Sequence, residues 1–251
     1  VGSSASVDYL YRAILLELVF GSGIACALVL KSIRVLGDFM PSTHVARNVQ
    51  GADRFQCLDI GAGTGLLSLM AAQKNIQIKI DAVEIDAPAA EQVRENIAAS
   101  PWINNIQVFN EDIISFKAEK KYDYIISNPP FFEDDLKSAD KTKNNAKHDT
   151  SLSLLELLQV VDNHLATAGI FAVLLPYHRV DYFIEESKKR GLYLTTQVLV
   201  KHTIKHKFFR GILFFNREET KPELSEIIIK DIEHKYTPEF AAALKDYYLF
   251  L

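Results

Sequence analysis

From about residue 54 onward, short apolar runs alternate with longer segments whose apolar positions recur every three or four residues. The short runs predict buried strands, and the periodic segments predict amphipathic helices. Strands are predicted at 55–60, 78–84, 106–110, 122–127 and 169–176, and helices at 66–74, 87–99, 151–165 and 180–190. This alternation predicts an α/β fold with a doubly wound, mostly parallel sheet that carries helices on both faces.

The pattern changes toward the end of the chain. Residues 192–200 and 208–216 are two β-rich segments with no helical segment between them. They predict an antiparallel hairpin at the edge of a seven-stranded sheet, joined by a basic loop. A last strand-like run at 226–229 precedes a helix that starts near Pro238.

The first part of the chain does not share this alternation, so we expect an N-terminal cap segment over 1–53 and the main domain over 54–251. Residues 13–30 are strongly apolar, but the run contains Glu17 and is at the short end for a membrane span. We expect this run to face the core of the cap, and we expect no membrane attachment.

A long polar stretch at 131–150 shows neither a helical nor a strand period. Stretches of that length inside a compact domain are usually functional lids or disordered segments. Ser151, which follows it, is a residue type that favours a helix N-cap, so we expect the next helix to begin there.

Composition narrows the class of protein only slightly. The net charge is −4, which counts mildly against a large nucleic-acid interface but leaves room for a local basic patch. The two cysteines, Cys26 and Cys57, lie in apolar runs without metal-ligand spacing. They are interpreted as small core residues of a cytoplasmic protein without a metal site. Nothing in the sequence indicates an oligomeric state.

Glycines alternate with other residues where the first strand turns into a helix. Asp59 ends that strand, and Gly61, Gly63 and Gly65 follow it. Such a turn lets a ligand approach the backbone and offers the free N–H groups of a helix N-terminus. Taken alone, the turn fits a dinucleotide or a nucleoside cofactor, and it could also be purely structural.

Two acidic residues follow the next two strands. Glu84 comes roughly 20 residues after the glycines, which is the usual interval for an acid that accepts both hydroxyls of a ribose. Asp112 could accept from the amino group of an adenine ring while Ile113 packs on that ring, or it could simply cap a short helix. All three sites follow the carboxyl ends of strands, where open α/β sheets bind ligands.

The fourth strand ends in a motif with specific chemistry, Asn128, Pro129, Pro130 and Phe131. The amino group of adenine is a poor nucleophile because its lone pair is delocalised into the ring. The Asn128 side-chain oxygen and the Pro129 carbonyl can accept its two hydrogens, and the two prolines keep both acceptors aimed. Phe131 can stack on a base taken out of its helix or loop. The motif favours methyl transfer to a planar nitrogen over dinucleotide chemistry.

The hairpin loop is the most concentrated basic and aromatic segment of the chain. Lys201, Lys205, Lys207 and Arg210 lie in or beside it, and Lys147 belongs to the polar stretch. These side chains could contact the phosphates of a nucleic acid, or they could form solvated charge runs.

Together, the glycine turn, Glu84, Asp112 and the Asn-Pro-Pro-Phe motif resemble the class I S-adenosylmethionine-dependent amino-methyltransferases, which have a Rossmann-like fold. One subgroup is especially similar, the bacterial tRNA1(Val) (adenine-37-N6)-methyltransferases. The resemblance covers about residues 54–251, and its more specific parts are 100–102, 136–140, 146–148, 151–153, 236–238 and 247–251. It implies S-adenosylmethionine as cofactor and N6 of an adenosine in tRNA as methyl acceptor.

Two other functions remain open from the sequence. A protein glutamine amide has the same planar nitrogen, so an N5-glutamine methyltransferase would use the same acceptor pair. A non-catalytic RNA-binding protein could also keep the fold, although an intact Asn128 argues against it.

Overall fold

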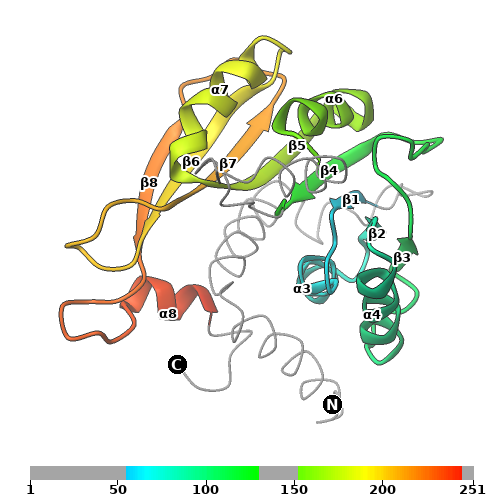
Figure 1. The fold of residues 1–251 in the computed structure, drawn as a ribbon, viewed down its shortest axis with the longest axis horizontal. Coiled ribbons are helices and arrows are strands. Elements are labelled where there is room, and N and C mark those ends of the chain that lie inside the picture. The colour runs from blue at the N-terminus through cyan, green and yellow to red at the C-terminus, as the bar shows by residue number, and fades with distance from the viewer. Residues whose placement is uncertain (1–54, 130–151, 245–251) are drawn as a thin grey trace, which may run out of the picture.

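The computed structural model describes residues 55–129 and 152–244 (Figure 1). The strands are β1 (Gln56–Ile60), β2 (Lys79–Val83), β3 (Ile106–Phe109), β4 (Tyr122–Ser127), β5 (Leu165–Pro176), β6 (Tyr193–Lys201), β7 (Arg210–Asn216) and β8 (Glu223–Ile228). The helices are α3 (Leu66–Lys74), α4 (Ala87–Ala98), α6 (Leu154–His164), α7 (Val180–Lys188) and α8 (Pro238–Leu244), with a 3-10 turn, η2 (Tyr177–Arg179). Within these ranges the strands form one eight-stranded sheet in the order β3-β2-β1-β4-β5-β7-β6-β8.

The first half of the sheet is parallel, as the sequence predicts. Strands β3, β2, β1, β4 and β5 pair side by side in the same direction. Ile60 at the end of β1 is level with Val83 of β2 and with Ser127 of β4. The segments that follow these strands therefore gather at one end of the sheet, where the carboxyl ends of the parallel strands lie.

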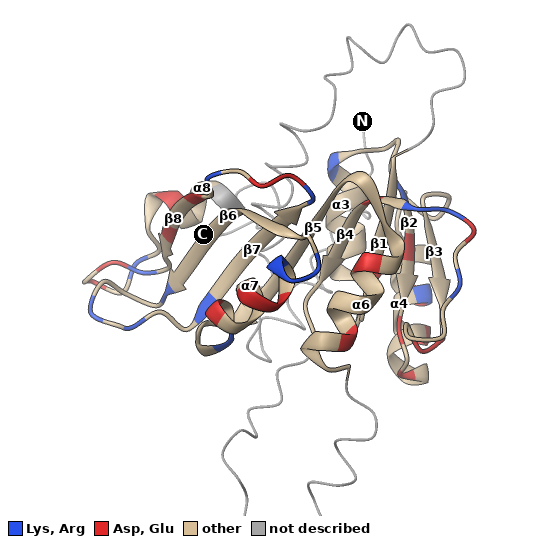
Figure 2. Ribbon diagram, turned by 90° about the horizontal axis from the view of Figure 1, so that it is seen from above, with Lys and Arg blue, Asp and Glu red and all other residues tan. Residues whose placement is uncertain are grey.

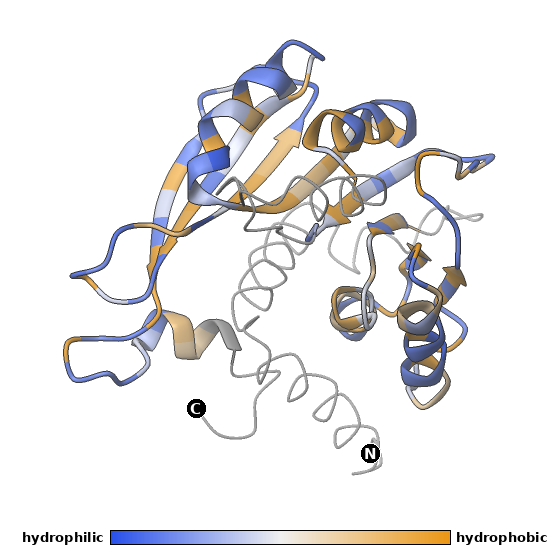
Figure 3. Ribbon diagram, in the orientation of Figure 1, coloured by the Kyte–Doolittle hydropathy of each residue, from blue (hydrophilic) through white to orange (hydrophobic). Residues whose placement is uncertain are grey.

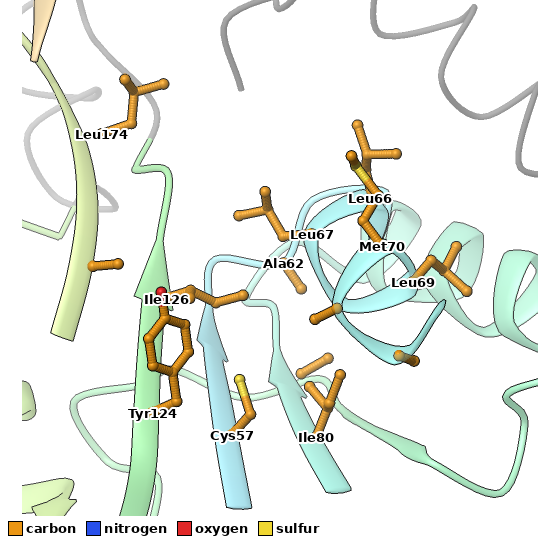
Figure 4. Packing of buried hydrophobic residues seen from close by; sticks show 14 of the residues in the cluster. Cys57, Ala62, Leu66, Leu67, Leu69, Met70, Ile80, Tyr124, Ile126 and Leu174 are labelled. Atoms are coloured by element: carbon orange, nitrogen blue, oxygen red, sulfur yellow. The ribbon is translucent and has the colours of Figure 1, made fainter. Parts of the chain in front are cut away.

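Two hydrophobic cores lie on the two faces of the sheet, because successive residues of a strand point to opposite sides. On one face, Cys57 of β1 packs beneath α3 with Leu66, Met70 and Ile80 (Figure 4). On the other face, Leu58 belongs to the cluster that includes the buried side chains of α6 and α7. This confirms the doubly wound arrangement, and the apolar residues concentrate in strands such as β5 and β7 (Figure 3).

The expected strand count and the expected sheet edge are both wrong. The antiparallel hairpin of β6 and β7 is present, but β7 lies between β5 and β6. The run predicted at 226–229 forms β8, which pairs in parallel with β6 and occupies the edge. If β6 were the edge strand, its outer backbone N–H and C=O groups would be unpaired. Strand β8 pairs with these groups and is the eighth strand of the sheet.

The expected start of α6 is also wrong by two residues. Its N-cap is Ser153, whose Oγ accepts from Glu156 N at 3.2 Å while Glu156 Oε2 accepts from Ser153 N at 2.8 Å. This reciprocal capping box satisfies two backbone donors, which a cap at Ser151 would not achieve. Ser151 lies outside the described residues.

The structure tests the remaining expectations, on the two cysteines, the cap segment and the polar stretch, only where they fall on described residues. Cys57 is buried, and burial raises the pKa of its thiol, so it is the inert core residue that the sequence predicts. Cys26, the cap segment 1–53 and the stretch 131–150 lie outside the described residues. Among the helices of the described ranges, none is long and apolar enough to cross a membrane.

Candidate active site

The glycine turn after β1 is tied to β2 and has open space beside two of its residues. Gly61 N and Ala62 N donate to Val83 O at 2.9 and 3.2 Å, which ties the turn to β2. Gly61 and Gly63 have φ angles of +70° and +57°, and a Cβ atom at either residue would meet no other atom within 4 Å. The left-handed backbone and the open space beside it form a cradle that a ligand can enter.

Gly65 serves a different purpose. Its φ is +81°, and a Cβ atom there would lie only 2.8 Å from Val93 Cγ1 of α4. Asn96, also in α4, donates from Nδ2 to Thr64 O at 2.9 Å. The absent side chain at Gly65 thus allows α4 to pack against the turn, while no side chain caps the N-terminus of α3.

Glu84, directly after β2, is joined to the glycine turn. Its Oε2 accepts from Gly63 N at 2.8 Å, and its Oε1 accepts from Asp86 N at 2.9 Å. The side chain is only 8% exposed. Each carboxylate oxygen keeps a second lone pair, so Glu84 is able to accept from a ligand hydroxyl without releasing the turn.

Asp59 is wholly buried beneath the same turn. Its Oδ2 accepts a 2.7 Å hydrogen bond from Ser68 Oγ, which holds α3 against the end of β1. The structure therefore gives Asp59 a supporting position under the turn, whereas Gly61, Gly63 and Glu84 form its surface.

The third acid lies beyond β3. Asp112 is exposed, and its Oδ1 accepts from Ile114 N at 2.9 Å. Residues 113–115 form a turn, not the short helix that the sequence left open as an alternative. Ile113 is only 7% exposed because it packs into the core. The apolar surface at this edge comes instead from Ile85 and Ile114, which are 53% and 55% exposed. Sequence reasoning missed these two residues, although an isoleucine directly after Glu84 was a usable signal.

A buried acceptor that no described residue satisfies lies directly after β4. Ser127 Oγ donates to Ile60 O at 3.0 Å and aligns the end of β4 with that of β1. The next residue, Asn128, has its Oδ1 buried with no hydrogen-bond partner among the described residues. Pro129 is buried beside it, whereas Pro130 and Phe131 lie outside the described residues.

The basic segment before β7 is only partly available to a ligand. Lys205 and Lys207 are exposed, whereas Lys201 is 14% exposed and forms an ion pair of 3.0 Å with Glu226. Figure 2 shows Lys and Arg in the loops beside β6, β7 and β8. The guanidinium of Arg210 lies 5.6 Å from the centre of the Phe209 ring, and Lys147 lies outside the described residues.

Aromatic rings reinforce that segment. His202 stacks on Phe209 with ring centres 3.9 Å apart and planes 12° apart. Burial lowers the pKa of His202, and the nearby charges of His206, Arg210 and Lys230 lower it further. Both effects favour the neutral form of the His202 ring. In the described residues, no group of His, Cys, Asp and Glu side chains could hold a metal ion.

Comparison of the sequence with known proteins identifies the family of the chain. Residues 41–172 match the family model of the methyltransferase small domain. The chain is 38% identical over 192 residues to a tRNA1(Val) (adenine(37)-N6)-methyltransferase of Pseudoalteromonas translucida, which covers 76% of this chain and 82% of that protein. A protein of the same description from Dyadobacter fermentans is 41% identical over 208 residues, covering 80% and 85%. The chain therefore belongs to the family of these tRNA1(Val) (adenine(37)-N6)-methyltransferases.

Solved structures agree with this methyltransferase fold. A predicted O-methyltransferase of Agrobacterium tumefaciens superposes with a TM-score of 0.57 at 16% identity, covering 78% of this chain and 91% of that one. A proposed RNA methyltransferase of Pyrococcus horikoshii gives 0.53 at 19% identity, covering 76% and 82%. These likenesses concern the fold alone, and they confirm the expected Rossmann-like class.

Proposed function

We propose that this methyltransferase transfers a methyl group from S-adenosylmethionine to N6 of an adenosine in tRNA, at position 37 beside the anticodon of a valine tRNA. The relatives described above carry that activity in their names. The observation that supports it most directly is the buried Oδ1 of Asn128, directly after β4, which has no hydrogen-bond partner among residues 55–129 and 152–244. An unpaired buried acceptor is costly, and a substrate N–H would satisfy it.

The glycine cradle fits S-adenosylmethionine. Gly61 and Gly63 leave open space where side chains would stand, and Glu84 offers carboxylate lone pairs for the ribose hydroxyls. Asp59 supports the turn from below, Gly65 sets its packing, and the segment containing Asp112 and Ile113 would border the adenine ring. When bound, S-adenosylmethionine supplies an electrophilic methyl group.

The residues after β4 would prepare the acceptor nitrogen. Asn128 Oδ1 and the Pro129 carbonyl would accept the two N–H hydrogens of the adenine amine, which localises the lone pair on N6. Pro130 would hold the turn rigid, and Phe131 would stack on the base. Positioning then carries most of the rate, so the site needs no strong general base.

The basic loop would hold the RNA. Exposed Lys205 and Lys207, together with Arg210, Lys201 and Lys147, are proposed to contact phosphates. We assign methyl transfer to residues 54–251 and regard residues 1–53 as a separate N-terminal cap segment. We place the reaction in the cytoplasm, where tRNA is found. The family match begins at residue 41 and so includes the end of the proposed cap.

The decisive experiment offers the protein methyl-labelled S-adenosylmethionine and total tRNA from a strain that lacks its gene. We expect label in N6-methyladenosine, identified by mass spectrometry, at an initial rate that is roughly 100- to 1000-fold lower with the Asn128→Ala variant. Label in protein but not in tRNA would replace the proposal with N5-glutamine methylation. Tight tRNA binding without any label would favour a non-catalytic RNA-binding protein.

A further inference from the structure

Tyr177 is an exposed aromatic residue at the carboxyl end of β5. It opens η2, and its side chain is 43% exposed. Its ring centre lies 5.6 Å from that of Phe208, with the planes 47° apart, and its N–H donates to Phe209 O at 3.0 Å. The backbone bond and the ring contact hold Tyr177 in place while part of its ring faces solvent.

The segment that contacts this ring carries several cationic residues, of which Lys201 is paired with Glu226. Lys201 Nζ lies 5.0 Å from the centre of the Phe208 ring, so Phe208 has contacts with both Tyr177 and Lys201. The exposed side chain of Lys207 precedes Phe208, and Arg210 follows Phe209. An aromatic ring among cations suits a ligand that combines flat π-faces with negative charge, which describes single-stranded nucleic acid.

The position of Tyr177 relative to Asn128 suits a second base. Ser127, which precedes Asn128, is level with Val173 of the neighbouring strand β5. Pro176 is three residues farther along that strand, which corresponds to roughly 10 Å at the usual rise per residue. Tyr177 therefore lies beyond the same carboxyl end of the sheet as Asn128 and is offset from it along the strands. This offset suits a base next to the one whose amine Asn128 accepts.

We propose that Tyr177, braced by Phe208, is a stacking platform for an unpaired nucleobase next to the methylated adenosine. This inference rests on the proposed function and deepens it, because it makes the substrate a single-stranded loop whose bases are splayed apart. Stacking of this kind tolerates any base, so Tyr177 would contribute affinity and orientation, while the acceptor pair after β4 selects the amine.

The test measures binding of a tRNA anticodon stem-loop by fluorescence anisotropy. Tyr177→Ala is expected to weaken binding roughly 5- to 100-fold, the range that stacking of one base supports. Tyr177→Phe should bind like the wild type, because it keeps the ring. Tyr177→Leu, which keeps apolar packing on Phe208 without a π-face, should bind as weakly as Tyr177→Ala. Tyr182→Ala is the matched control, since Tyr182 in α7 is 42% exposed and so nearly as exposed as Tyr177.

An abasic substitution identifies the base involved. The test RNA lacks the base at one nucleotide beside the target adenosine. The wild type should bind this RNA as weakly as Tyr177→Ala binds the intact RNA. Tyr177→Ala should bind the intact and the abasic RNA with equal affinity. Thermal melting of each variant shows that the loop before β7 is still folded. Equal binding by all Tyr177 variants, or full binding by Tyr177→Leu, would overturn the platform.

The same samples separate this inference from the proposed function. If the wild type forms N6-methyladenosine in the stem-loop and Tyr177→Ala binds and reacts normally, the platform is wrong and the function stands. If the wild type neither binds nor methylates any RNA, both are wrong.

Discussion

The backbone N–H of Gly63 donates a 2.8 Å hydrogen bond to Glu84 Oε2 and so links the glycine turn after β1 to the acid after β2. The same carboxylate accepts from Asp86 N through its other oxygen. One side chain thus fixes the shape of the turn and presents acceptor lone pairs at its surface. The turn and the acid act as one unit, although 21 residues separate them.

Replacing Glu84 with Gln tests this unit. Glutamine cannot accept from Gly63 N and Asp86 N through two oxygens, and it loses the charge. Charge-assisted hydrogen bonds contribute about 1.5–3 kcal/mol, so we expect the dissociation constant for S-adenosylmethionine to rise roughly 10- to 100-fold in calorimetric titrations. Glu91→Gln, an exposed change in α4, is the control and should bind normally. Unchanged binding by Glu84→Gln would remove Glu84 from the cofactor site.

Gly65 and Gly63 are expected to differ in what an added methyl group disturbs. Gly65→Ala combines a positive φ with a contact of 2.8 Å to Val93, so we expect it to lower the free energy of unfolding by about 2–4 kcal/mol. The second change Val93→Ala should recover part of that loss. Urea denaturation provides the measurement, and equal stability of the single and double variants would contradict the packing argument.

Gly63→Ala, by contrast, places its methyl group in open space. We expect it to cost only the backbone strain of about 1–2 kcal/mol while abolishing measurable cofactor binding. A Gly63→Ala protein that binds S-adenosylmethionine as tightly as the wild type would show that the cradle is not the cofactor site.

Asn128→Ala should separate activity from stability. Loss of one preorganised hydrogen-bonding group in an active site lowers kcat roughly 100- to 1000-fold. Removing a buried acceptor that has no partner in the described residues also removes the cost of leaving it unpaired, so we expect the free energy of unfolding to stay the same or rise by about 1–3 kcal/mol. Single-turnover methylation and urea denaturation measure the two effects.

Asn105→Ala is the opposite control. Asn105 Nδ2 donates to Ile76 O and Ile78 O at 2.8 Å, just before β3 and away from the carboxyl ends of the strands. This variant should lose stability and keep kcat. Normal methylation by Asn128→Ala would show that its amide does not activate the acceptor.

His164 gives a pH dependence of stability with a defined sign. Burial lowers its pKa in the folded protein, and the charge of Lys121 lowers it further. The folded state therefore binds a proton more weakly than the unfolded chain, whose histidine pKa is about 6.5. The stabilisation is complete above that pH and is lost as the pH falls from there toward the folded-state pKa.

We expect the free energy of unfolding to fall more steeply below pH 6.5 for the wild type than for His164→Gln, measured by urea denaturation across pH 5.5–7.5. The exposed His178 in η2 provides the matched control His178→Gln. Parallel profiles for the wild type and His164→Gln would contradict this linkage.

Local patterns were sufficient for most elements of the fold. Helix α3 and strand β4 have the bounds that the sequence predicts. A run of strong helix formers such as Leu, Met and Ala and a run of β-branched and aromatic residues are both local signals. The edge of the sheet was not predicted correctly. Strand β8 reaches the edge by pairing with β6, and no local sequence pattern encodes where β6 lies in the sheet.

The candidate site shows the same division. The glycines, Glu84 and Asn128 were found from the sequence because their residue types and spacing carry the chemistry. The exposure of Ile85, the burial of Ile113 and the ring contact of Tyr177 with Phe208 were not foreseen. Each depends on which face of a turn points outward, and that depends on the packing of segments distant in the chain.

The sequence by itself determined the fold class, the family resemblance and the order of the site motifs, because each depends on residues close together along the chain. Only the tertiary structure decided which groups meet. Tyr122, for example, donates a 2.7 Å hydrogen bond to Asp81, a buried pair 41 residues apart. Burial and that bond raise the pKa of Tyr122. Such pairs form when parallel strands align in register, and register is a property of the assembled sheet.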